Sequence, residues 1–116
     1  MHLEVTFKNL RAREEIRKRA TALFKKLERF LDPSAEGQLI VAVEHGSAVL
    51  ELVVTTHGEV HKALEEEEEL RTALDKLFHT MEGQLRRAKS RRITKRKGGD
   101  AEDGFVEDEE GDTATL

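Results

Sequence analysis

The sequence has no cysteine, no tryptophan, no tyrosine and a single proline in 116 residues. Without cysteine the chain can form neither a disulfide, nor a thiolate nucleophile, nor a cysteine-based zinc site, and its absence fits a reducing compartment. No apolar run approaches the roughly 18 residues of a membrane-spanning helix. Residues 1–7 alternate polar and apolar side chains instead of forming a secretion signal. We therefore expect a soluble, cytoplasmic protein.

Sequence motifs of enzymes and of cofactor sites are also missing. There is no glycine-rich phosphate loop and no nucleophile elbow, and the carboxylates come in runs that are typical of solvated surfaces. His57 and His61 are four residues apart, but a predicted turn separates them, so they lack helical geometry and a third metal ligand. We expect surface or half-buried histidines, no catalytic residue, no metal and no cofactor.

The net charge of −4 combines two regions of opposite sign. Residues 98–116 contain eight acidic residues and no basic one, which leaves 20 basic and 16 acidic residues, a net charge of +4, in residues 1–97. The acidic segment has too little apolar content to offset the entropy lost on ordering. We predict one small domain over residues 1–97 and an acidic, disordered tail over residues 98–116.

The spacing of apolar residues predicts the order β-α-β-β-β-α. His45-Gly46-Ser47 joins two β-branched segments as a hairpin turn would, and His57-Gly58 is a second turn signal. This order is typical of an α+β two-layer sandwich in which a four-stranded sheet packs on two helices. The predicted strands are residues 2–7, 38–44, 48–56 and 60–65, and the predicted helices are residues 14–31 and 70–97.

The second predicted helix changes character along its length. The acidic run Glu65–Glu69 lies just before it, where acidic side chains complement the helix dipole. Arg92 and Lys95 return to the angle of the apolar stripe, so the packed part should end near Ser90. The stripe itself consists of Leu70, Leu74, Leu77, Phe78, Met81, Leu85 and Ala88.

The end of this helix, residues 84–97, carries eight basic residues and no acidic one. A solvated helix face normally mixes charges so that i,i+4 ion pairs form, and none can form inside this segment. We interpret it as a surface for RNA or DNA phosphates, read by charge and shape because aromatic residues are scarce. The first helix also presents cations away from its apolar stripe. The predicted RNA-binding residues are Lys18, Lys25, Lys26, Arg29, Arg86, Arg87, Lys89, Arg91 and Arg92.

Five short pieces of the sequence, in their order and spacing, resemble one known family. They are Arg17, Phe24-Lys25-Lys26-Leu27-Glu28-Arg29, Gly58-Glu59-Val60-His61, Ala73-Leu74-Asp75-Lys76-Leu77 and Gln84-Leu85-Arg86-Arg87. The family is that of the bacterial ribosome hibernation factors, with the short hibernation promoting factor and the ribosome-associated inhibitor A, or protein Y. The resemblance covers nearly the whole chain and implies a fold similar to double-stranded RNA-binding domains. Lys26, Arg29, Arg87 and Arg91 match positions that are usually basic in the family.

The resemblance implies a ribosome-associated translation inhibitor, a stress-response hibernation factor. It would bind the small ribosomal subunit and its rRNA in the decoding channel and block the mRNA and tRNA sites. It further implies a non-enzymatic protein that is a monomer off the ribosome and has no membrane partner and no small-molecule substrate. The chain departs from the family pattern at Leu23 and Thr80, where Lys or Arg is usual, at Arg71, which replaces an aromatic residue, and at Gly83, which replaces an Arg.

Two other functions remain open at this point. One is a protein-binding regulator, such as a sigma-factor modulator, that uses Glu65–Glu69 and the acidic tail on a basic partner. The other is a generic binder of double-stranded RNA. Co-sedimentation with small subunits distinguishes the first from a ribosome ligand, and comparing affinity for small subunits with affinity for a plain RNA duplex distinguishes the second.

Overall fold

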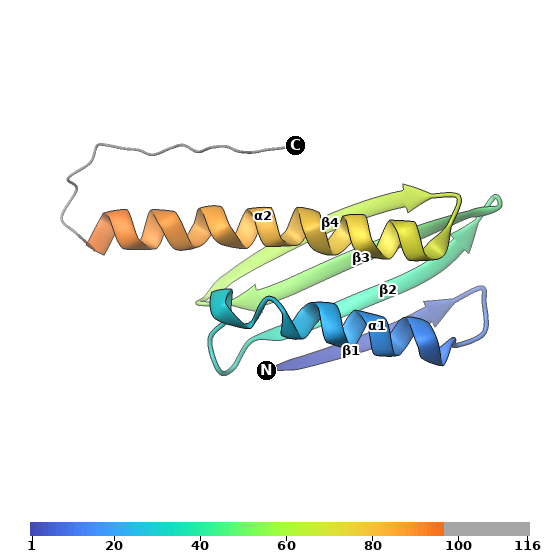
Figure 1. The fold of residues 1–116 in the computed structure, drawn as a ribbon, viewed down its shortest axis with the longest axis horizontal. Helices are drawn as coiled ribbons and strands as arrows, with labels where there is room; N and C mark the ends of the chain where they lie inside the picture. The colour runs from blue at the N-terminus through green and yellow to red at the C-terminus, as the bar shows by residue number, and fades with distance from the viewer. Residues whose placement is uncertain (97–116) are drawn as a thin grey trace. The chain divides into compact units, whose positions relative to one another are not determined.

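The computed structural model describes residues 1–96, and it gives side-chain surroundings up to residue 94. The predicted tail at residues 98–116 and the basic residue Lys97 lie outside the described residues, so the predicted domain boundary stays a prediction. The described chain forms two compact units, one from Met1 to Glu82 and one that begins at Gly83. The elements (Figure 1) are β1 (His2–Lys8), α1 (Glu14–Lys25), the 3-10 helix η1 (Glu28–Phe30), β2 (Glu36–Glu44), β3 (Ser47–Thr56), β4 (Glu59–Glu67) and α2 (Leu70–Arg96).

The four strands form one mixed sheet in the order β1-β2-β3-β4. β1 and β2 are parallel, as a connection through α1 requires, and the other pairs are antiparallel. Both antiparallel pairs are closed by a two-residue His-Gly turn: His45 and Gly46 have φ of 53° and 80°, and His57 and Gly58 have φ of 52° and 74°. Positive φ at both central residues is the geometry that matches the twist of paired strands. The predicted fold class and both predicted turns are therefore confirmed.

The core lies between one face of the sheet and the two helices. Figure 1 shows α1 and the first part of α2 on the same face of the sheet. Along β3 every second side chain, from Ala48 to Thr56, is buried, which is the period of a strand covered on one face. The contact is close at Gly37 of β2, because a Cβ atom there would lie 2.8 Å from Cε1 of Phe24 in α1. The largest fully buried side chains of this unit are Leu39, Val41, Leu50, Leu52, Val54, Leu74, Leu77 and Met81.

The first helix is shorter than predicted. The α-helix ends at Lys25, and the amide of Leu27 donates to the carbonyl of Phe24, three residues back, at 2.9 Å. The chain then makes one 3-10 turn, in which Leu27 and Phe30 still point into the core with 3% and 4% of their surface exposed. The apolar positions were therefore predicted correctly, but the helix type was not, because both kinds of helix place residues three apart on one side.

The fourth strand is longer than predicted. It continues to Glu67, since it pairs with the whole of β3, and the acidic run is therefore mostly strand rather than helix start. Glu65 and Glu67 are half-buried at alternate positions of the helix-covered face, where Nζ of Lys76 lies 3.0 Å from Oε2 of Glu67. The hydrogen bond from Lys76 lowers the pKa of Glu67, whereas burial, with a further contribution from Glu67, raises the pKa of Glu65.

The same strand buries His61, which was expected from the sequence to be half-buried or at the surface. His61 pairs with Val54 of β3 and faces the helix-covered side of the sheet, with 9% of its surface exposed. Its Nε2 atom lies 3.2 Å from Oε1 of Glu59. The reason is strand parity: His61 shares its face with Ala63, and the turn at His57-Gly58 sets which residues point inward.

Candidate nucleic-acid interface

The cations of α1 lie on the side of the helix away from the core. Ile16, Ala20 and Phe24 are buried, and Lys18 and Lys25, seven residues apart, are exposed on the opposite side. Neither lysine side chain makes a hydrogen bond or ion pair with any other described residue. The charges of these two lysines are therefore not neutralised by an ion pair within the described fold.

Four other basic side chains in the first unit have an acidic partner within the fold. Arg13 and Arg17 lie beside Glu15 and Glu14, at 2.8 and 3.7 Å, and Lys76 lies beside Glu67. Arg17 also lies 5.4 Å from the ring centroid of Phe7, so its charge covers the end of β1. These paired cations are structural, and they are not available to a ligand as Lys18 and Lys25 are.

Two further predicted residues follow at the end of α1. Lys26 is the C-cap of the helix and is exposed, and its amide donates to the carbonyl of Ala22 at 3.2 Å. The guanidinium of Arg29 is exposed and lies 4.8 Å from the ring centroid of its neighbour Phe30. The 3-10 turn therefore sets the direction of Arg29, because Phe30 is anchored in the core.

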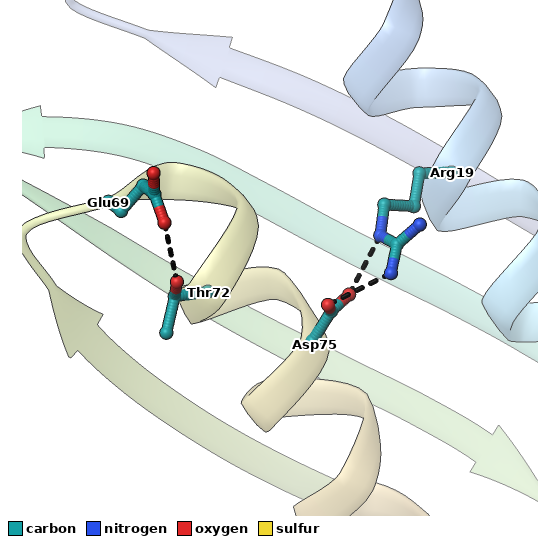
Figure 2. Close-up of polar contacts among 4 residues, drawn as sticks. All are labelled: Arg19, Glu69, Thr72 and Asp75. Atoms are coloured by element: carbon teal, nitrogen blue, oxygen red, sulfur yellow. Dashed lines mark hydrogen bonds and ion pairs between the residues drawn. The ribbon is translucent and has the colours of Figure 1, made fainter.

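An ion pair joins α1 to the first part of α2 (Figure 2). Nε and Nη2 of Arg19 donate to Oδ1 and Oδ2 of Asp75 at 2.8 and 2.9 Å, which is the two-pronged geometry that fixes a guanidinium most tightly. The hydrogen bonds from Arg19 hold the pKa of Asp75 below its ordinary value, and nearby Lys26 contributes to the same shift. Arg19 is therefore a structural residue, and Lys26 lies close enough to feel the charge of Asp75.

Beside this ion pair, α1 and α2 enclose a shallow groove of about 240 Å³. Its walls are apolar at Leu23, Leu27 and Phe78 and polar at its rim. The groove was not predicted from the sequence, although one of its lining residues, Leu23, stands where a basic residue is usual in the family. The remaining lining residues are Lys26, Asp75, His79 and Glu82.

The start of α2 is fixed by a local hydrogen bond. Oγ1 of Thr72 donates to the carboxylate of Glu69 at 2.8 Å (Figure 2), and the amide of Ala73 donates to the carbonyl of Glu69 at 3.1 Å. These bonds use a carboxylate at the N-terminal end of the helix, where the dipole favours it. Glu69 thus retains the helix-start role that was predicted for the whole acidic run.

The second unit contains the basic part of α2. Leu85 and Ala88 are each 1% exposed, and no described residue after Ala88 is buried, which confirms that the packed stripe ends near Ser90. The guanidinium of Arg87 folds back along the helix, so that Nη1 would lie 3.6 Å from a Cβ atom at Gly83. Of the predicted residues, Arg86, Arg87 and Arg91 are exposed and Lys89 and Arg92 are half-buried.

Other kinds of site find little support in the described part of the chain. No group of three or more histidine, aspartate or glutamate side chains in residues 1–94 is arranged to hold a metal ion. None of the described helices is both long and apolar enough to cross a membrane.

Comparison with known proteins identifies the family. The family model described as Sigma 54 modulation protein / S30EA ribosomal protein matches residues 3–93. The structure is similar to the N-terminal domain of Protein Y from Thermus thermophilus, with a TM-score of 0.70 and 23% identity over 75% of this chain and 98% of that one. It is also similar to a ribosomal subunit interface protein from Coxiella burnetii, with a TM-score of 0.64 and 22% identity over 78% and 99% of the two chains.

No functionally curated protein matches the sequence at a significant level. The two structural likenesses, at 22% and 23% identity, establish the fold, and the family model establishes the relationship. Both agree with the motifs that were quoted from the sequence. The family model places the chain in a ribosome-associated family that is generally non-enzymatic. The chain belongs to the Sigma 54 modulation protein / S30EA ribosomal protein family, the family of ribosome hibernation factors.

Proposed function

We propose that this chain silences idle ribosomes by occupying the decoding channel of the small subunit, where it blocks the positions of the mRNA and the tRNAs. It acts by occupancy and not by catalysis. It works in the cytoplasm, and it is a monomer until it binds. The family relationship supports a ribosomal ligand, and the observation that carries the proposal is the pair of unneutralised lysines, Lys18 and Lys25, on the exposed side of α1.

Phosphate is the ligand that this surface fits best. Lysine and arginine side chains that lack an internal acidic partner gain most from a polyanion, because each contact releases condensed counterions. Lys26 and Arg29 extend the same positive surface past the end of α1. With neither tyrosine nor tryptophan in the chain, base stacking contributes little, so the RNA is recognised by its backbone and shape.

The basic part of α2 is a second phosphate-binding segment in this proposal. Residues 84–97 contain no acidic side chain, so cations four residues apart, such as Arg87 and Arg91, repel one another along the helix. Phosphates bound along the helix would remove that repulsion. Binding to RNA therefore stabilises this end of α2, which a role as a merely solvated surface would not do.

Gradient sedimentation tests the proposal directly. Purified chain mixed with separated small and large subunits should sediment with the small subunits at physiological salt and return to the top of the gradient at high salt. The proposal is wrong if the chain stays at the top at all salt concentrations, as a sigma-factor ligand would. A generic duplex binder would instead bind a plain RNA duplex as tightly as it binds small subunits.

A further inference from the structure

One face of the sheet is covered by helices and the other is not. Within residues 1–82, α1 and α2 lie on one face (Figure 1), and no described element of this unit lies on the opposite one, which we call the outer sheet face. Along β3, the side chains of Val49, Glu51 and Val53 point to this outer face and are half-buried, while their neighbours Leu50 and Leu52 are fully buried beneath the helices.

Glu51 lies at the centre of the outer sheet face. Its partner on β2 is Ile40 and its partner on β4 is Leu64, so the three side chains form one row across the sheet. Side chains directly opposite one another in such a row have Cβ atoms roughly 5 Å apart. Val49 and Val53, two residues away on the same strand, flank the row at roughly 7 Å. We call these four residues, Ile40, Val49, Val53 and Leu64, the apolar ring around Glu51.

The carboxylate inside this ring has no partner. The side chain of Glu51 makes no hydrogen bond or ion pair with any other described residue, although Lys62 lies on the same face, opposite Val53 in the next row. Glutamate is disfavoured in strands, and a β-branched residue would suit a central strand better. Leu64 is also 67% exposed, one of the few large apolar side chains in the described chain that are. An unpaired carboxylate and an exposed leucine do not stabilise the isolated domain. We interpret them as parts of a surface that binds a partner.

We propose that the outer sheet face docks a protein surface that presents one arginine or lysine within an apolar frame, with the cation paired to Glu51 and the frame packed on the apolar ring. Protein interfaces have this composition, with an apolar centre, a satisfied charged anchor and arginine enriched. Any partner that covers the ring removes water from Glu51, and burying an unpaired carboxylate is strongly unfavourable. The partner must therefore supply a cation.

The charge of the outer sheet face also argues against two other partners, RNA and a second copy of this chain. RNA would bring phosphates against Glu51, and the face is negative on balance, because Glu4, Glu36, Glu44 and Glu66 outnumber Lys8 and Lys62 on it. A second copy packed ring against ring would bring one Glu51 against the other. This proposal rests on the proposed function. If the cations of α1 bind RNA, the outer sheet face lies on the opposite side of the same unit and is free to contact a protein of the small subunit.

Four variants test this on two probes, small ribosomal subunits and the protein-free RNA extracted from them. Glu51→Gln should weaken binding to subunits at least about tenfold, and Glu51→Arg should weaken it more, because a charged anchor at an interface is lost or reversed. Neither should weaken binding to the extracted RNA. If long-range electrostatics alone acted, both Glu51 variants would bind subunits more tightly than the wild type, since removing a negative charge strengthens attraction to RNA. Glu68→Gln and Glu68→Arg, in the exposed segment between β4 and α2 and outside the outer sheet face, are the matched controls.

If the Glu51 and Glu68 variants bind subunits equally while the wild type binds them tightly, the docking proposal is overturned and the proposed function stands. If the wild type does not bind subunits, both are overturned. A photo-crosslinking residue at position 64 gives an independent readout that does not depend on the Glu51 variants. It should attach the chain to a protein of the small subunit, whereas the same residue at position 25 on α1 should attach it to RNA. Attachment of position 64 to RNA contradicts the proposal.

Discussion

Arg19 and Asp75 are 56 positions apart in the sequence, and their side chains form two parallel hydrogen bonds that tie α1 to α2. The pair leaves 35% of the Arg19 side chain and 43% of the Asp75 side chain exposed. Its contribution to stability is therefore reduced by solvent screening. Its role is geometric, because it fixes the spacing of the two helices beside Lys26 and the groove.

The pair predicts a specific dependence of stability on pH. The folded-state pKa of Asp75 is lowered from its ordinary 3.8. The ion pair therefore adds its full stabilisation well above pH 3.8, and this is lost as the pH falls through the lowered folded-state pKa. The difference in unfolding free energy between wild type and Asp75→Asn should be constant near neutral pH and shrink below pH 4. Urea denaturation across the acid range measures it, with Glu44→Gln as the control. A difference that does not change with pH would contradict this role.

Gly37 should be intolerant of even one added methyl group. A Cβ atom there would lie 2.8 Å from Cε1 of the buried Phe24 ring and 3.0 Å from Cδ1 of Leu3. Gly37→Ala should therefore lower the unfolding free energy by roughly 1–3 kcal/mol, the usual cost of overpacking a core. Chemical denaturation measures the change, and an unchanged midpoint would mean that α1 does not pack on β2 this closely.

Gly83 should respond to the same substitution with the opposite sign. It lies inside α2, where the nearest atom to an added Cβ would be Nη1 of the flexible Arg87 at 3.6 Å. Because glycine is costly in a helix, Gly83→Ala should raise the unfolding free energy by roughly 1 kcal/mol. Denaturation of both glycine variants in one series makes each the control for the other. A loss of stability in Gly83→Ala would contradict an open site here.

The sequence predicted elements whose periodicity extends over many residues. The stripe from Leu70 to Ala88 and the alternation along β3 were sufficient to define α2 and the central hairpin. The turns were predictable because His-Gly pairs between apolar runs favour positive φ. Element boundaries that depend on tertiary contacts could not be predicted. At the end of α1, for example, Leu27 and Phe30 continue the apolar spacing although the helix type changes.

The candidate site was predictable only in its composition. The exposed cations of α1 and α2 follow from helical periodicity. None of the nine predicted RNA-binding residues is buried: Lys89 and Arg92 are half-buried and the other seven are exposed. No sequence signal pairs Arg19 with Asp75, because the contact depends on how two helices pack. Similarly, the alternation of β3 places Glu51 on the outer face, but its apolar ring depends on the register with β2 and β4.

Inhibition of translation should be stoichiometric. A protein that acts by occupying the decoding channel inhibits one ribosome per molecule and needs no cofactor. In a cell-free translation reaction, activity should fall in proportion to added protein until its concentration reaches that of the ribosomes. Complete inhibition at a small fraction of the ribosome concentration would indicate catalysis and would contradict occupancy.

The phosphate contacts themselves can be removed without touching the core. A four-cation variant replaces by alanine the predicted residues that match basic positions of the family, Lys26, Arg29, Arg87 and Arg91. All four are exposed, so circular dichroism and thermal unfolding should show a folded domain. A control variant with the same loss of charge replaces Arg11, Arg13, Arg71 and Lys76, which are neither predicted RNA-binding residues nor residues of the outer sheet face.

The salt dependence of small-subunit binding is the measurement that tests the account most directly. Each phosphate contact adds roughly one unit or less to the slope of log affinity against log salt. The four-cation variant should bind small subunits far more weakly than wild type at low salt, with a slope that is flatter by up to about four, while the control variant keeps an affinity and slope close to wild type. An unchanged affinity and slope in the folded four-cation variant would contradict the assignment of these surfaces to ribosomal RNA.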